Sequence, residues 1–250
     1  MLDMIELQGG GAPENSSLRG KEAGFTLAEV LITIGIIGLV AALTLPALIN
    51  NNRNKALETA FKKNYSAISQ ALNMYYAQNG ERLTPEYVGR HELKPILIKY
   101  MNVLHDCGWG AEHTDEELKK ACIPNSSDAT KRSQVYKNFN GTNTIPLALL
   151  DDGQFILNDG SLILLENTGG TTLIISVDVN GYLKNPNRLG QDLFMFQIDN
   201  KGNLLPMGAE GTDYYDENDA YCSKTSTSTK NGAGCTIKAI NEKDYFTKLH

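Results

Sequence analysis

The sequence predicts an α+β fold in which one long N-terminal helix, first membrane-embedded and then soluble, packs on an antiparallel β-sheet. Three patterns predict it. Residues 25–49 are almost purely apolar, residues 53–78 continue with apolar positions at helical spacing, and residues beyond 153 alternate with a period of two between turn signals. The 250 residues suffice for a real core, and a hydrophobic content of 41% argues against global disorder.

The apolar run reads FTLAEVLITIGIIGLVAALTLPALI and contains one charged residue, Glu29. As a helix it rises about 37 Å, enough to cross a hydrocarbon core of about 30 Å. The segment before the apolar run carries four acidic residues against two basic ones, and no A-x-A cleavage pattern follows the run. The N-terminus therefore differs from a cleaved secretory signal. A retained membrane helix is therefore favoured over a buried core helix, which is usually shorter and has a polar face.

Glu29 is unexpected in this run, because a charged residue lies in an otherwise apolar segment. A carboxylate in a bilayer is costly unless it is paired, which makes it a candidate for function. The alternative is a position near the membrane interface, since Glu29 lies only five residues into the run.

The sequence GFTLAEV at residues 24–30, followed by a long Leu/Ile/Val run, resembles the N-terminus of type IV prepilins and type II secretion pseudopilins. The resemblance covers roughly residues 20–80 and implies a pilin-like fold. It implies that a membrane aspartyl peptidase cuts between Gly24 and Phe25 and methylates the new N-terminus. It also implies that Glu29 pairs with the N-terminal amine of a neighbouring subunit and that Pro46 kinks the helix.

Four segments follow from this resemblance. They are a prepilin leader (1–24), a transmembrane helix (25–49), a soluble stalk helix (50–80) and an exported globular head (81–250). Basic residues are more numerous just after the apolar run than before it, and this bias alone would place the head in the cytoplasm. The junction motif and the even number of cysteines favour a single-pass protein of the inner membrane with its head exported.

The soluble half of the helix has a clear apolar face, with Gly80 as its C-cap. The apolar positions recur at spacings of three and four, at Leu57, Phe61, Tyr65, Ile68, Leu72 and Tyr75. Two further helices are predicted over residues 86–101 and 114–121, the second because Thr114 and Glu117 form a capping-box pattern.

The strand signals predict a sheet of four or five antiparallel strands lying against this helix. Turn residues at 158–160 and at 199–202 each join two short β-type segments. The predicted strands are 154–157, 161–165, 171–179, 193–198 and 203–207.

Four cysteines fall into two local pairs, Cys107/Cys122 and Cys222/Cys235. An even count in an exported head favours two disulfides, each worth about 3 kcal/mol in the chain-entropy model. Free thiols are one alternative. A zinc site is the other, with four ligands drawn from His105, Cys107, His113 and Cys122, although their spacing matches no standard zinc pattern.

A second candidate ion site lies between two predicted strands. Asp178, Asn180 and Asp192 carry oxygen ligands suitable for calcium, and some relatives in the secretion family bind calcium in a comparable loop. The plainer interpretation is that these side chains form Asx turns that order a long connection. A further loop is acidic and is expected to face solvent; its acidic residues are Asp213, Asp216, Glu217 and Asp219.

No catalytic residues are assigned, because the sequence contains no nucleophile elbow, metalloprotease motif, phosphate-binding glycine loop or kinase signature. His91 lies in a predicted helix and is expected at the surface. A net charge of −6 and a pI near 5.3 lack the electrostatic footprint of a nucleic-acid binder.

The expected function is therefore that of a structural subunit of a type IV pilus-like or type II secretion pseudopilus filament. Its expected partners are the prepilin peptidase, other pilin or pseudopilin subunits, the inner-membrane assembly platform and the lipid bilayer. One alternative is a minor tip pilin, an adhesin or a DNA-uptake pseudopilin. A DNA-uptake pseudopilin would contact DNA. A non-polymerising, membrane-tethered enzyme or sensor is the other.

Overall fold

The structure is a computed structural model that describes residues 24–110, 120–123, 135–167 and 171–249. The chain divides into two compact units, Met1–Ala47 and Leu48–His250. Helix α1 (Leu27–Asn79) belongs to both, and Pro46 lies inside it. The predicted helix over 114–121 falls mostly outside the described residues.

The described part of the first unit consists of residues 24–26, which form no regular secondary structure, and the start of α1. Its side chains from residue 27 to 47 are exposed, except that of Ala41, which is half-buried. Among the described residues, α1 is the one helix long and apolar enough to cross a membrane; its most apolar window has a mean hydropathy of 2.4 and no buried residue. A helix that is apolar on every side requires an apolar environment, and the described residues do not cover this part of α1.

Within the second unit, α1 buries a single face. The buried residues follow each other at alternating spacings of three and four, which is one stripe of an α-helix: Asn54, Leu57, Phe61, Asn64, Ile68 and Ala71. Tyr65, Leu72 and Tyr75 border this stripe and are partly buried. The helix ends as predicted at Gly80, whose φ of +77° and N–H bond to the Tyr76 carbonyl form a glycine C-cap.

The sheet has six antiparallel strands in sequential order, so every strand pairs with its neighbour in the chain. The strands are β1 (Val103–Asp106), β2 (Gln154–Leu157), β3 (Leu162–Asn167), β4 (Leu173–Asp178), β5 (Leu193–Ile198) and β6 (Leu204–Pro206). The α+β prediction is confirmed, and the predicted strands match β2 to β6. The sequence missed β1, because this edge strand exposes Leu104, His105 and Asp106 and lacks an alternating pattern.

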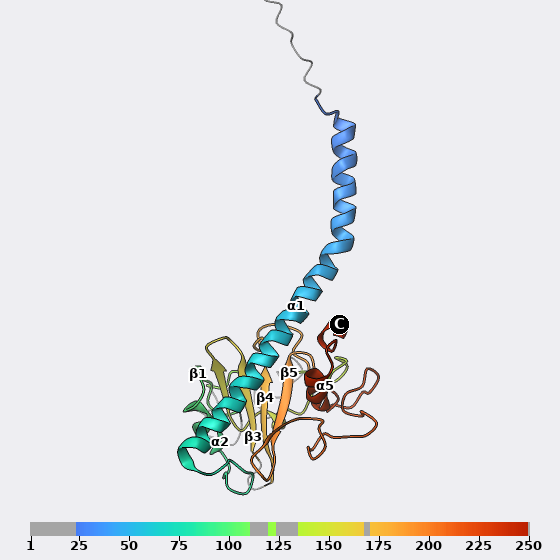
Figure 1. Cartoon of the computed structure of the whole chain (residues 1–250). Helices are drawn as coiled ribbons and strands as arrows, with labels where there is room; N and C mark the ends of the chain where they lie inside the picture. The colour runs from blue at the N-terminus through green and yellow to red at the C-terminus, as the bar shows by residue number, and fades with distance from the viewer. Residues whose placement is uncertain (1–23, 111–119, 124–134, 168–170, 250) are drawn as a thin grey trace, which may run out of the picture. The chain divides into compact units, whose positions relative to one another are not determined.

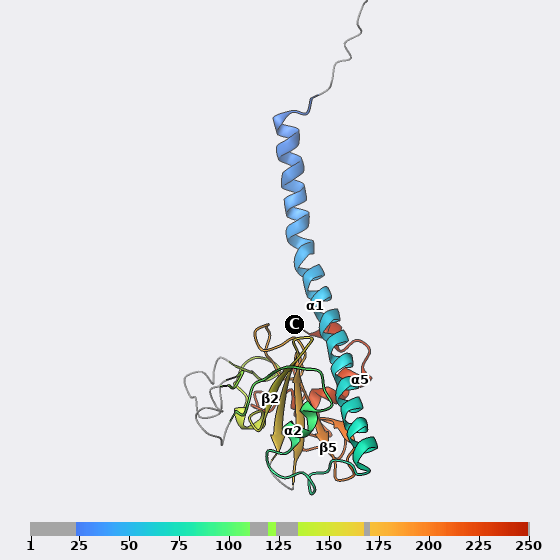
Figure 2. The ribbon, with the colours of Figure 1, turned by 90° about the vertical axis from the view of Figure 1, so that its left-hand side faces the viewer.

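The alternation along the strands supplies two cores, one on each face of the sheet. Phe155, Ile163 and Ile175 point to the face that α1 covers, together with Phe194 and Phe196 of β5. The ring of Phe61 lies 4.5 Å from that of Phe194, between centroids. Figures 1 and 2 show the second half of α1 lying along this face.

Among the described residues, the opposite face is covered mainly by loops and short 3-10 turns. Its strand residues include Leu162, Leu164 and Met195, which pack against Tyr136 and Leu150 from the connection before β2. Because both faces are buried, the central strands carry few exposed positions and are fixed in register from both sides.

The short helices differ most from the prediction. Helix α2 covers only Leu93–Ile98 instead of 86–101, because His91 adopts a positive φ of 64° that a continuing helix excludes. His91 therefore lies in a turn, with its ring 5.0 Å from that of Trp109. Beyond η1 (Leu147–Leu149), three short helical elements close the chain and were not predicted: η2 (Ala233–Cys235), α5 (Thr236–Asn241) and η3 (Phe246–Lys248).

We expect Phe61→Ala to destabilise the second unit by about 3–5 kcal/mol, because it leaves a cavity where α1 meets β5. The measurement is denaturant unfolding of the full chain in zwitterionic detergent, followed by the fluorescence of Trp109, the single tryptophan. Lys62→Ala is the matched control, because Lys62 follows Phe61 in α1 and its own side chain is 65% exposed. Equal effects of the two substitutions would contradict the packing of α1 described here.

Candidate functional site

The junction predicted to be cleaved lies immediately before α1. Gly24, Phe25 and Thr26 lie outside regular secondary structure and are exposed, and the Phe25 side chain is 86% accessible. A Cβ added at Gly24 would meet no atom within 4 Å, so nothing in the described chain covers this bond. The structure therefore leaves the Gly24–Phe25 peptide open to another molecule.

Glu29 is held by a reciprocal cap at the start of α1. Its carboxylate accepts hydrogen bonds from the backbone N–H and the hydroxyl of Thr26, both at 2.8 Å, and its own N–H donates to the Thr26 hydroxyl at 3.2 Å. This is a capping box, which satisfies free N–H groups at the helix start. The sequence analysis missed the role of Thr26, although the T-x-x-E spacing was there to indicate it.

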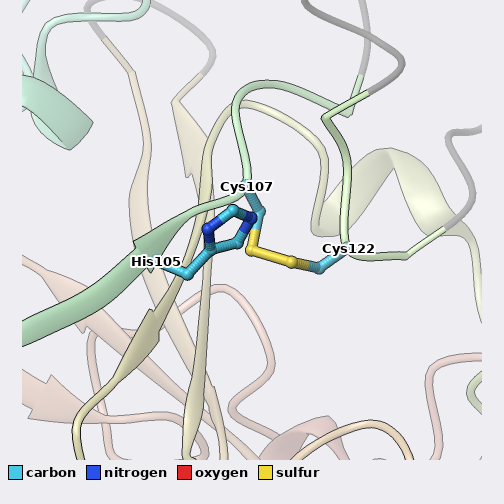
Figure 3. Close-up of side chains that lie close together, drawn as sticks. All are labelled: His105, Cys107 and Cys122. Atoms are coloured by element: carbon cyan, nitrogen blue, oxygen red, sulfur yellow. A yellow bond between two sulfur atoms is a disulfide. The ribbon is translucent and has the colours of Figure 1, made fainter.

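The cysteines form the two local disulfides expected from their even number in two local pairs, Cys107–Cys122 and Cys222–Cys235. Figure 3 shows His105 beside the first disulfide. A ring nitrogen of His105 lies within 4.8 Å of the two sulfur atoms. Sulfurs joined to each other are not thiolate ligands, so the zinc alternative is not supported. The fourth ligand of that alternative, His113, lies outside the described residues.

The loop between Cys222 and Cys235 is ordered by side-chain amides as well as by its disulfide. Asn231 donates to the carbonyls of Ser223 and Ser226 at 2.8 Å, and Asn138 and Asn143 donate to the carbonyls of Ser228 and Thr227. The loop is thus fastened to the segment before β2 at several points.

Asp178 and Asp192 lie buried at the ends of β4 and β5. One oxygen of Asp178 accepts the Tyr136 hydroxyl at 2.7 Å, and the other accepts the N–H groups of Asn180 and Gly181. Asp192 accepts N–H groups from the connection at 2.7 and 2.8 Å. The structure thus contains the Asx turns of the plainer interpretation.

The same cluster has the donor chemistry of a hard-cation site. Burial raises the pKa of both Asp178 and Asp192, and the charge of Asp192 raises that of Asp178 further. The amide oxygens of Asn180 and Asn187 are buried without a hydrogen-bond partner. Two buried carboxyls and two unsatisfied amide oxygens suit a cation such as calcium, which takes oxygen ligands.

The remaining acidic loop is tied to the fold by its own hydrogen bonds. Asp213 accepts from Gln197 and Thr172, Asp216 accepts two N–H groups, and Asp219 pairs with Lys238 at 2.8 Å. These contacts give the loop a structural role.

Two buried charged groups were missed by the sequence analysis. Asp151, Asp152 and Glu166 have ligand atoms within 4.8 Å of one another, and Asp152 accepts the Asn167 N–H at 2.9 Å. Lys94 is 3% exposed, pairs with Asp106 at 2.5 Å and donates to the Gly108 carbonyl. The adjacent acids Asp151 and Asp152, just before a predicted strand, were the one sequence signal for the first group. Nothing in the sequence of α2 indicated that Lys94 is buried.

Comparisons with known proteins agree with the junction and with α1. A family described as "Prokaryotic N-terminal methylation motif" matches residues 19–45. Type II secretion system core protein G of Dickeya chrysanthemi is 30% identical over 103 residues, covering 37% of this chain and 67% of that protein. The same protein of Aeromonas hydrophila is 36% identical over 66 residues (26% and 46%), and that of Escherichia coli K12 is 39% identical over 59 (24% and 40%).

These similarities do not extend over the whole molecule. The chain spans less than half the length of the Aeromonas and Escherichia relatives, and no solved structure matches it. They do cover two thirds of the Dickeya protein and include the N-terminal methylation motif. The chain therefore belongs to the family of type IV prepilins and type II secretion pseudopilins.

Proposed function

We propose that this chain is a structural, non-catalytic subunit of a type II secretion pseudopilus or a related type IV pilus-like filament. The observation that carries the proposal is the exposed apolar half of α1 directly behind an accessible Gly24–Phe25 junction. A helix of this kind is stable first among lipid tails and then among the equivalent helices of other subunits.

Membrane anchoring with an exported head is supported by two independent features. The apolar segment is long enough to span a bilayer, and the head contains two disulfides, which persist in oxidising compartments. We infer a single-pass protein of the inner membrane that an assembly platform extracts into the filament. The relatives carry the name of a secretion-system core protein, which favours secretion over adhesion or DNA uptake.

Processing and assembly use the residues around the junction. A prepilin peptidase removes residues 1–24 and leaves a free amine on Phe25. Glu29 then pairs with the Phe25 amine of a neighbouring subunit, because two charges in a bilayer offset much of each other's desolvation cost. The capping box holds the Glu29 carboxylate at the start of the helix before assembly.

The proposal predicts that the protein recovered from native membranes begins at a methylated Phe25. Intact mass and N-terminal sequencing test this directly, with cells lacking prepilin peptidase as the control. A chain that retains residues 1–24 in cells with active peptidase would make the junction motif a coincidence and favour the membrane-tethered alternative.

Glu29→Ala is expected to abolish filament assembly and leave cleavage intact. Removing one partner of a buried ion pair costs about 3–5 kcal/mol, a change of more than a hundredfold in the equilibrium. Sheared filaments and processed subunits are quantified by immunoblot from the same cells.

Glu29→Gln separates charge from capping, because Gln also serves in a capping box but carries no charge. Thr26→Ala does the reverse, since it removes the cap and keeps the carboxylate. Normal filaments from Glu29→Gln would refute pairing with the amine and assign the role of Glu29 to capping.

For the head, we propose that Asp178, Asn180 and Asp192 bind calcium, with Asn187 as a further oxygen donor. The buried carboxyls are costly when ionised and uncompensated, so a cation at neutral pH would stabilise the connection between β4 and β5. The calcium ion would supply charge compensation and structural order, not chemistry.

At pH 7.5, calcium is expected to stabilise the full chain against unfolding relative to the chelator EGTA. The gain is about 2.7 kcal/mol when free calcium exceeds its dissociation constant a hundredfold. Asp192→Asn should abolish this difference, whereas Glu217→Gln, in the exposed acidic loop, should preserve it. Identical unfolding curves in calcium and EGTA would assign Asp178 and Asp192 to Asx turns alone.

A further inference from the structure

A groove lies between the C-terminal segment and the connections before β2 and β5. It consists of two adjoining hollows of about 250 and 240 Å³. Both hollows are lined by Phe139, Lys224, Lys248 and Leu249. The first also reaches Lys238 and Glu242, and the second reaches Arg188 and Gln191. We call these residues together the basic groove.

The basic groove is positive although the chain has a net charge of −6. Its four cationic side chains face one lining acid, Glu242. Lys238 pairs with Asp219 and Lys248 with Asp244, at 2.8 and 2.7 Å. Within the part of the chain that the structure describes, no ion pair involves Arg188 or Lys224, so their charges remain uncompensated.

The walls of the basic groove are fixed by contacts that do not depend on a ligand. The Tyr245 hydroxyl donates to the Gly190 carbonyl at 2.5 Å, and the Gln191 side chain donates to the Phe139 carbonyl at 2.8 Å. The Arg188 guanidinium lies against Gly141, where a Cβ would come within 2.7 Å of it. A cationic site with rigid walls binds an anion without a large ordering cost.

The basic groove lies close to the end of the apolar segment. The Leu249 carbonyl, at its edge, accepts a hydrogen bond from the Asn54 side chain at 3.3 Å. Asn54 follows Ile49, the last residue of the apolar run, by five positions, a rise of about 7–8 Å along the helix. The polar layer on each side of a bilayer is roughly 5–7 Å thick, so the groove is within reach of headgroups.

We propose that the basic groove binds the phosphate group of an anionic phospholipid and so holds the head against the membrane before assembly. Its hollows are smaller than sites for drug-sized ligands, about 300–1,000 Å³, and suit a phosphate ester. A free phosphate would use the same cations, but the contact of Leu249 with Asn54, five residues after Ile49, favours the lipid. The inference rests on the membrane anchoring proposed above and not on filament assembly.

The test measures acetylation rates of individual lysines by mass spectrometry in the full chain in lipid nanodiscs. Discs of phosphatidylcholine alone are compared with discs that also contain phosphatidylglycerol. Lys224 and Lys248 are expected to react about fivefold more slowly in the anionic discs, since each cation near such a surface gains about 1 kcal/mol. Lys99 and Lys201 are internal controls, because both are exposed and lie outside the groove.

Arg188→Gln removes one charge from the groove without changing either reporter lysine, and it should reduce their protection. Lys201→Gln, a charge-matched control, should not. A third arm adds millimolar inorganic phosphate in zwitterionic detergent at constant ionic strength. Protection in anionic discs alone supports the lipid, and protection by free phosphate alone overturns the lipid assignment in favour of a soluble phosphate ester.

Equal rates in both kinds of disc without a phosphate effect, or equal slowing at Lys99 and Lys201, would overturn the proposal. The test requires only that the chain is inserted in a bilayer. Failure of processing or of filament assembly is measured separately and leaves this outcome unaffected.

Discussion

The packing of one face of α1 against the sheet is the contact on which the rest of the second unit depends. Leu57, Phe61 and Ile68 bring the helix against β3, β4 and β5, where Phe194 and Phe196 meet the Phe61 ring. The same element supplies both the core of the head and the apolar segment. Within the second unit, α1 therefore contributes to an aromatic cluster that also includes Phe194, Phe196 and Phe246.

The second face of the sheet is buried without a long helix among the residues that the structure describes. Irregular segments cover this face, and they are held by amides from Asn138, Asn143 and Asn231 and by two short disulfide loops. Each local closure reduces the conformational entropy that these loops would otherwise retain.

Periodicity and turn chemistry predicted the parts of the fold that are regular over many residues. The second half of α1 and its end at Gly80 follow from the helical spacing of one buried face. Strands β2 to β6 follow from short β-type segments bounded by turn residues. Strand β1 and helix α5 could not be predicted in this way, because their residues are defined by neighbours far away in sequence. Lys94 illustrates the limit, since its burial depends on Asp106 and Trp109, which only the tertiary fold brings to it.

The candidate sites follow the same division. The junction and the cysteine pairs are local in sequence and could be predicted, whereas the basic groove joins residues from 139 to 249. Its position bears on orientation, because basic residues after a membrane segment normally favour the cytoplasmic side. That rule is weak for a body as long as residues 50–250, since large domains translocate largely regardless of charge. Cations retained on the exported side then require another role, and contact with anionic headgroups beside the apolar segment provides one.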